Sequence, residues 1–148
     1  MLIRAISAVA SIEEAGPLLV EHWGEVARNK EVMVLKPNVL AYQALEDAGA
    51  LISLGAFDDG RMVGYAVTIC SAHLHYADLI YASNDVIFVA GSHRNGPAGI
   101  RLMRETERLA LERGARLILW HAKPDTTLDR ILPRMGYGVQ ETVFSRQL

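Results

Sequence analysis

The sequence predicts a single α/β domain of the α+β type, with helices flanking a central mixed, mostly antiparallel sheet. The chain has 148 residues, of which 51% are hydrophobic, so residues 1–148 match the size of one domain with a full core. The β-rich runs 51–57 and 62–69 are separated by a turn sequence, which indicates an antiparallel hairpin. A further strand-like run, 86–90, leads into an amphipathic helix. Together these observations favour a sheet with helices packed against it.

The N-terminal part of the chain is expected to form one strand and two helices. Residues 2–8 are an apolar run of β-type composition. Ser11, with an acidic residue three positions later, has the pattern of a capping box and begins a helix, in which Pro17 is expected near the first turn. Pro37 suits the first position of a second helix, and Gly49 is placed as its C-terminal cap.

The hairpin turn and the helix that follows it carry strong local signals. Asp58-Asp59-Gly60-Arg61 joins the two β-rich runs and is typical of a tight turn between antiparallel strands. Residues 98–113 have one apolar face and one charged face, which predicts an amphipathic helix. Gly114 is expected to end that helix.

The C-terminal part is expected to form a strand, a short helix and a final strand or two. Residues 117–121 are the strand, and Asp125 or Thr126 can cap the short helix. Pro133 should end or kink this helix near its preceding residue. The tail from Tyr137 alternates between apolar and polar residues, as a strand does.

Composition excludes several classes of function. Fifteen Lys and Arg residues against 17 Asp and Glu give a net charge of −2 with no continuous basic field, so no nucleic-acid partner is expected. Cys70 is the only cysteine, which excludes an internal disulfide framework and a Cys-rich zinc site. The N-terminal apolar run is too short for a secretory leader, and no run reaches the roughly 18 residues of a membrane span. We therefore expect a cytoplasmic protein without a membrane partner.

The segment from Phe88 to Met103 carries the clearest functional signal. Here a strand turns into a helix through the small residues Gly96, Ala98 and Gly99. Free backbone N–H groups at a helix start, together with the helix dipole, favour a phosphate group that can approach closely. No Gly-Lys-Ser/Thr of a P-loop follows, and the glycines do not complete a dinucleotide-binding fingerprint. The pattern therefore indicates an anion site that is not that of a nucleoside triphosphatase.

In this segment the chain resembles the GNAT superfamily of N-acetyltransferases. The signature of that family is Arg or Gln, two residues, Gly, one residue, then Gly or Ala; Arg94 takes the first place, Gly99 the last, and Pro97 replaces the middle Gly. Two shorter matches, Met62-Val63-Gly64 and Arg134-Met135-Gly136-Tyr137, follow the family order. The order of elements is similar over nearly the whole chain, and it also resembles the small GNAT proteins of tailed phages.

The resemblance implies an enzyme that uses acetyl-CoA as co-substrate, with no metal. The family strand that here ends at Val89 splays from the next strand, near Leu119, and the Val89 N–H would stabilise the oxyanion of a tetrahedral intermediate. The acetyl group would pass directly to a primary amine within a ternary complex. The residues that the resemblance assigns to cofactor binding are Phe88, Val89, Arg94, Asn95, Gly96, Pro97, Ala98, Gly99 and Ile100.

The acid and base are less well defined than the cofactor site. Family members often protonate the departing thiolate with a Tyr, and Leu132 occupies that position here. Asp85 lies where the family often holds an acidic residue facing the acceptor amine, and a carboxylate or a neutral imidazole can accept the proton of an ammonium group. The catalytic candidates are Asp85, His121 and His75, followed by His73, Tyr76 and Lys123.

Two other classes of function remain as alternatives. His73 and His75 lie on one face of an extended segment, and His121 could complete a three-histidine metal site, which would make a metal-dependent enzyme. The missing Tyr is also consistent with a catalytically weak acetyl-CoA-binding or interaction protein. The acceptor can be a small molecule or a protein amine, and a homodimer is an open alternative to a monomer.

Overall fold

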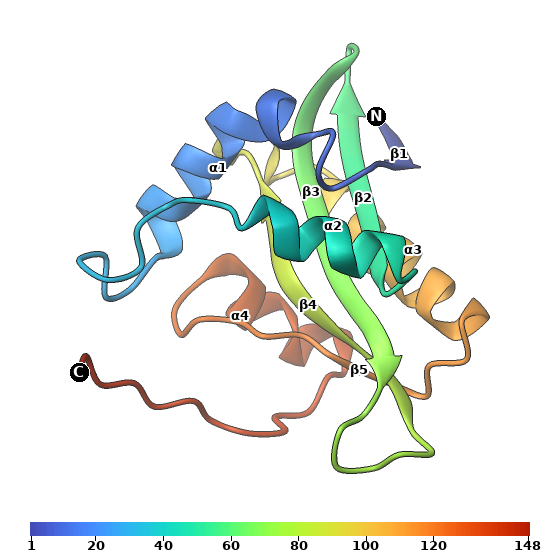
Figure 1. Cartoon of the computed structure of the whole chain (residues 1–148). Helices are drawn as coiled ribbons and strands as arrows, with labels where there is room; N and C mark the ends of the chain where they lie inside the picture. The colour runs from blue at the N-terminus through green and yellow to red at the C-terminus, as the bar shows by residue number, and fades with distance from the viewer.

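The computed structural model describes all residues, 1–148, and contains one five-stranded sheet in the order β1-β2-β3-β4-β5. Strands β1 to β4 pair antiparallel in sequence order, whereas β5 runs parallel to β4 (Figure 1). The prediction of a mixed, mostly antiparallel sheet is therefore confirmed. The strands are β1 (Leu2–Ala5), β2 (Leu51–Asp58), β3 (Arg61–Ala72), β4 (Ile80–Val89) and β5 (Leu117–Leu119).

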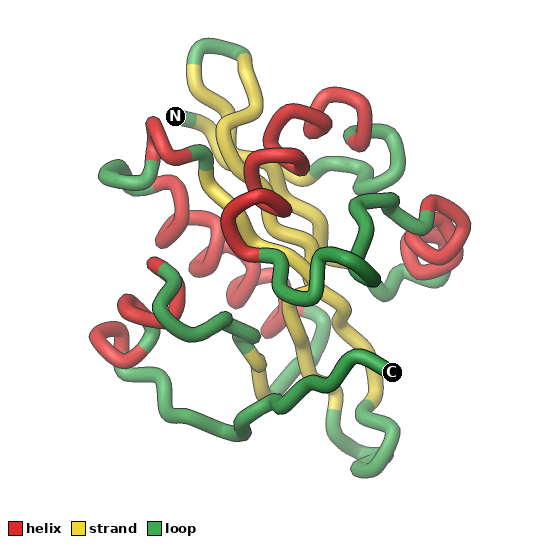
Figure 2. Tube along the Cα trace, turned by 90° about the vertical axis from the view of Figure 1, so that its left-hand side faces the viewer, coloured by secondary structure: helices red, strands yellow, loops and turns green.

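Helices cover both faces of the sheet. Helices α1 and α2 lie on one face and α3 lies on the other (Figures 1 and 2). Two clusters of buried side chains follow from this arrangement, one between α3 and the sheet and the other beneath α1. No helix has the length and apolar character needed to span a membrane. The helices are α1 (Ile12–Val26), α2 (Val39–Asp47), α3 (Ala98–Glu112) and α4 (Thr127–Ile131), with 3-10 turns η1 (Gly91–His93) and η2 (Pro133–Met135).

The hairpin between β2 and β3 forms as the sequence predicts. Asp59 and Gly60 are the two loop residues, with φ of 46° and 77°. Two consecutive positive φ values define the tight turn whose twist matches that of the flanking strands. The local sequence therefore sets the register between β2 and β3 near this turn.

Two helix starts differ from the sequence predictions. Ser11 precedes α1, but its side chain makes no capping hydrogen bond, because its backbone is already helical, with φ −93° and ψ −2°. Pro17 then lies inside α1 and not in its first turn. Pro37 does not begin α2, because Asn38 is the N-cap and its side chain accepts a hydrogen bond from the Ala41 N–H at 3.2 Å. An amide side chain offers the acceptor that proline lacks.

The other helix ends agree with the sequence. Gly49 and Gly114 follow α2 and α3 with φ of 68° and 86°, the left-handed conformation that ends helices. Thr126 caps α4 by accepting a hydrogen bond from the Asp129 N–H at 3.3 Å. Helix α4 ends at Ile131, just before the 3-10 turn that contains Pro133.

The prediction of one or two strands in the tail is wrong. Residues 137–148 contain no strand. Their apolar side chains lie in solvent, with exposed fractions of 89% for Val139 and 90% for Phe144. Apolar alternation produces a strand only where a partner strand supplies hydrogen bonds and a face to cover. In this chain a 3.3 Å hydrogen bond from Asn29 to Ser145 holds the tail near the end of α1.

Candidate active site

Strands β4 and β5 separate after a short stretch of parallel pairing. The pairing runs from Tyr81–Leu117 to Ser83–Leu119 and then stops. At the next position the buried Asn84 side chain accepts a hydrogen bond from the His121 N–H at 2.5 Å and donates one to the His121 C=O at 3.3 Å. A side chain thus replaces the next backbone pair, and β5 diverges from β4. The predicted splay between the strands of Val89 and Leu119 is confirmed.

The last residue of β4 directs its backbone groups into this splay. The Ala90 N–H donates to the Val63 C=O at 2.9 Å, and Gly64 lies opposite Val89. Because hydrogen-bonded and non-hydrogen-bonded pairs alternate along an antiparallel ladder, Val89 points its N–H and C=O away from β3. Beyond Ser83 there is no β5 backbone pairing on that side. The Val89 N–H is therefore placed to donate to a ligand in the splay.

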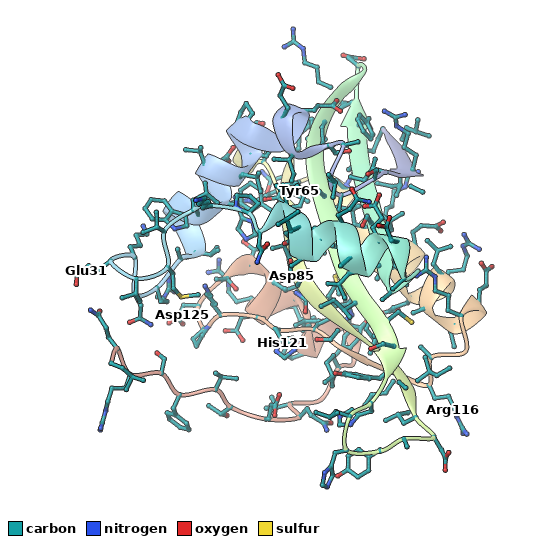
Figure 3. All side chains as sticks on the ribbon, in the orientation of Figure 1. Glu31, Tyr65, Asp85, Arg116, His121 and Asp125 are labelled. Atoms are coloured by element: carbon teal, nitrogen blue, oxygen red, sulfur yellow. The ribbon has the colours of Figure 1, made fainter.

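A β-bulge in β4 presents Asp85. Val67 pairs with Val86 and Thr68 pairs with Asn84, which leaves Asp85 as the extra residue on β4. Its exposed carboxylate accepts a short hydrogen bond from the Tyr42 hydroxyl of α2. Burial, reinforced by this hydrogen bond, raises the pKa of Tyr42, so that the phenol keeps its proton and stays a donor. Figure 3 shows Asp85, Tyr65 and His121 on the side of the sheet that carries α1 and α2.

An aromatic cluster lies beside Asp85 under α1. The His22 ring stacks on Phe88 at 4.6 Å between centroids, and its Nδ1 lies 2.8 Å from the Tyr65 hydroxyl. Burial, together with the positive charges of Lys123 and Arg94, lowers the pKa of His22 to about 4. The imidazole is therefore neutral at pH 7.

We expect this half-buried histidine to make the fold sensitive to acid. Its pKa is about 4 in the folded chain and 6.5 when solvated, so between these values the unfolded chain binds more protons. The free energy of unfolding should fall as the pH is lowered from 6.5 towards 4. Urea unfolding at pH 7.5 and pH 5 would measure the loss, which His22→Gln should reduce. An equal loss in both proteins would assign the sensitivity to other groups.

The start of α3 supplies backbone donors beside the splay. Pro97 is the N-cap residue, with φ −81° and ψ −2°, and no side chain caps the helix. The first N–H groups of a helix have no partner within it, so Ala98, Gly99 and Ile100 retain free donors. The Gly96 N–H is already bound to the His93 C=O at 3.1 Å, and proline has no N–H. The anion site thus has fewer donors than the full range from Asn95 to Ile100.

The histidines proposed from the sequence lie in two places. His121 follows β5, and its Nε2 lies 2.9 Å from the Ser83 Oγ. His73 and His75 lie on the loop between β3 and β4, where both contact Tyr76. His121 therefore lies on the same side of the sheet as Asp85, whereas His75 belongs to the hairpin loop. No group of three or more His, Cys, Asp or Glu side chains could hold a metal ion, so the three-histidine alternative is wrong.

The position of the expected acid is occupied by a core side chain. Leu132 is 9% exposed and offers no proton. Tyr137, further along the chain, donates its hydroxyl to Glu107 of α3, and Trp120 donates to the same carboxylate at 3.1 Å. Burial, strengthened by the bond to Glu107, raises the pKa of Tyr137 to about 12. This tyrosine therefore attaches the segment after β5 to α3.

Sequence patterns did not reveal three further residues of the candidate site. Tyr42, Tyr65 and His22 come from α2, β3 and α1, and each makes a contact with a residue 43 positions away. Contacts between residues so far apart in the chain leave no local sequence signal.

Comparison with known proteins supplies the fold family. No family model matches the sequence, and no curated protein is similar to it. Among solved structures, a ribosomal-protein-alanine N-acetyltransferase from Brucella melitensis biovar Abortus 2308 has a TM-score of 0.71 at 18% identity, covering 100% of both chains. An aminoglycoside N-acetyltransferase in complex with CoA has a TM-score of 0.70 at 17% identity, covering 99% of both chains.

A third solved structure extends the comparison to an acceptor complex. An aminoglycoside acetyltransferase from an uncultured soil metagenomic sample, in complex with sisomicin, has a TM-score of 0.76 at 13% identity and covers 99% of this chain and 95% of its own. All three similarities extend over nearly the entire length. The chain therefore has the fold of the GNAT superfamily of N-acetyltransferases.

Proposed function

We propose that the protein transfers an acetyl group from acetyl-CoA to a primary amine. The observation that carries this proposal is the Val89 N–H, directed into the splay between β4 and β5 and close in sequence to the free donors of α3. An oxyanion donor next to a phosphate site is the arrangement that a CoA thioester requires. The fold and the CoA complex of a structural neighbour support the same function.

The proposed chemistry assigns one step to each group. The Asp85 carboxylate accepts a proton from the acceptor ammonium, directly or through water, and frees the nitrogen lone pair. The nitrogen forms a bond to the thioester carbon while the carbonyl oxygen becomes an oxyanion that accepts the Val89 N–H. The C–S bond then breaks, the carbonyl re-forms, and the nitrogen loses its second proton to solvent water. The Tyr42 hydroxyl holds the Asp85 carboxylate in place.

The departing thiolate needs a proton that Leu132 cannot give. We assign this role to His121, whose imidazole lies on Ser83 where β5 leaves β4. A protonated imidazole carries an N–H that can be donated to a thiolate. His75 is left out of this assignment because it belongs to the hairpin loop.

Binding of acetyl-CoA is the first test. We expect millimolar acetyl-CoA to raise the melting temperature of the protein, because a ligand of the folded state stabilises it. Gly99→Trp should abolish the shift by filling the space beside Val89. Gly99→Ala is the matched control, since an added Cβ would lie 3.8 Å from the Val89 side chain, an ordinary contact. Absence of a shift in the unmodified protein would exclude acetyl-CoA as co-substrate.

Asp85→Asn tests the base. An amide cannot accept the ammonium proton, so kcat should fall by about 10²-fold or more while the KM for acetyl-CoA changes little. Release of CoA with a panel of amines gives both constants. Tyr42→Phe is the companion variant and should lower kcat less, because it removes only the hydroxyl that orients Asp85. An unchanged kcat for Asp85→Asn would remove this residue from the mechanism.

A binding protein without turnover is the second candidate, and the buried Leu132 at the usual acid position favours it. This candidate predicts a thermal shift with acetyl-CoA but no CoA release with any amine. The panel should include an amino sugar, a peptide N-terminus and a lysine side chain. Structural neighbours act on protein and aminoglycoside amines, so these acceptors cover both classes.

A further inference from the structure

The Arg94 side chain does not extend towards the start of α3. Its Nε donates to the Val89 C=O at 2.9 Å, and its guanidinium carbon lies 5.0 Å from the centre of the Phe88 ring. Arg94, the first residue of the loop from Arg94 to Gly99, therefore folds back onto the end of β4. It binds the C=O of Val89, the same residue whose N–H is the proposed oxyanion donor.

The other end of the guanidinium binds α1. Arg94 Nη2 lies 2.6 Å from a Glu25 carboxylate oxygen and 3.9 Å from Glu21. Glu21 also accepts a hydrogen bond from the Gly91 N–H at 2.8 Å. Two acidic residues, one helical turn apart on α1, thus hold both the arginine and the backbone just after β4.

These contacts use the groups that a phosphate would need. A guanidinium binds phosphate through its planar fork of N–H groups. Here Nε donates to the Val89 C=O, and Nη2 is buried in an ion pair with Glu25 that lacks hydrogen-bond geometry. Two carboxylates beside the guanidinium also repel a dianion. The Val89 C=O, in turn, would direct its negative end into the splay if it were left without a donor. Arg94 satisfies that carbonyl and fixes the peptide plane that follows Val89.

We propose that Arg94, held by α1, is a positioning residue that orients the Val89 backbone through its C=O, and that it is not a phosphate ligand. This inference rests on the proposed transfer of an acetyl group at Val89. In this arrangement Arg94 links the end of β4 to α1, because it binds the Val89 C=O and forms an ion pair with Glu25. The phosphate contacts are then left to the backbone N–H groups of α3.

Acetyl-pantetheine separates the two roles because it keeps the thioester and lacks the pyrophosphate. Arg94→Met should lower kcat by about tenfold or more with acetyl-CoA and by the same factor with acetyl-pantetheine, since small displacements of a catalytic group are costly. Its affinity for CoA should stay within about threefold of that of the unmodified protein. Arg94→Lys should not restore kcat, because an ammonium group cannot hold Glu25 and the Val89 C=O with the same fixed geometry. Glu25→Gln should lower kcat less, with the same pattern on both donors.

Arg116→Met is the matched control. Arg116 is exposed, makes no ion pair, and lies towards the other end of the molecule, near the β3–β4 loop (Figure 3). Its removal should leave both rates unchanged, and melting temperatures report whether each variant is folded. A defect of Arg94→Met that disappears with acetyl-pantetheine would overturn the proposal and make Arg94 a phosphate ligand. If Arg94→Met kept the kcat of the unmodified protein with both donors, the proposal would be overturned as well.

A measurement without turnover keeps this inference separate from the proposed function. The Arg94 Nε–H resonance, identified by its loss in Arg94→Met, should exchange slowly with solvent because Val89 accepts it. We expect this protection to persist when CoA is added. Fast exchange in the free protein, or release of the Nε–H on CoA addition, would contradict the positioning role. A protein that binds no acetyl-CoA at all would instead refute the proposed function.

Discussion

Val89→Pro is expected to lower kcat by about 10²- to 10³-fold, the usual cost of losing one oxyanion donor. The substitution removes a single N–H group. Because that N–H points away from β3, proline at this position breaks no bond of the β3–β4 ladder. Single-turnover measurement of CoA release would show whether the loss lies in the chemical step.

The control for this variant is Val89→Ala, which shortens the same side chain and keeps the N–H. We expect its kcat to remain far above that of the proline variant. Circular dichroism and thermal unfolding would establish that the proline variant is folded, and calorimetry would show that it still binds CoA. A folded Val89→Pro protein with the kcat of Val89→Ala would place the oxyanion donor elsewhere.

Gly64→Ala is expected to lower the free energy of unfolding by about 1–3 kcal/mol, as overpacking of a close contact does. A Cβ at this position would lie 2.8 Å from the Phe88 carbonyl oxygen and 3.1 Å from a Val89 methyl group. A backbone carbonyl in a paired strand cannot move away cheaply, so β4 must shift. Since the shift displaces Val89, kcat should fall together with stability. Urea unfolding and CoA release measure the two effects.

Gly16→Ala provides the opposite expectation in the same fold. Gly16 lies within α1, and a Cβ there would meet nothing within 4 Å. Alanine should raise the free energy of unfolding by about 0.5–1 kcal/mol, because glycine loses more backbone freedom in a helix. If Gly64→Ala proved as harmless as this control, the close approach of β3 and β4 would not be needed for the site.

Local sequence signals predicted the parts of the fold that depend on neighbours in the chain. Asp59 and Gly60 set the β2–β3 turn, and Gly49 and Gly114 end their helices, because each choice depends on a few backbone dihedral angles. The loop from Arg94 to Gly99 was located in the same way. Its side-chain chemistry was not, since Arg94 donates to the Val89 C=O and forms an ion pair with Glu25, which comes from a distant helix.

The bulge explains why simple alternation along β4 misplaces Asp85. Strict alternation along β4 would put Asp85 on the same face as Val89 and opposite Phe88. The extra residue reverses this, so that Asp85 reaches Tyr42 while Phe88, three positions later, meets His22. A bulge depends on pairing with another strand, which no periodicity within β4 reveals.

Asn84 has a consequence for how a ligand enters the protein. Its amide offers the β5 main chain the same donor and acceptor as a peptide group, but at the end of a side chain instead of at the strand axis. Paired strands normally stand about 4.8 Å apart. Beyond Ser83 the Asn84 side chain lies between β4 and β5 and keeps their backbones further apart. The backbones of β4 and β5 are therefore already unpaired at this point before any molecule binds. No ladder hydrogen bond has to break on arrival, and none has to re-form when the product leaves.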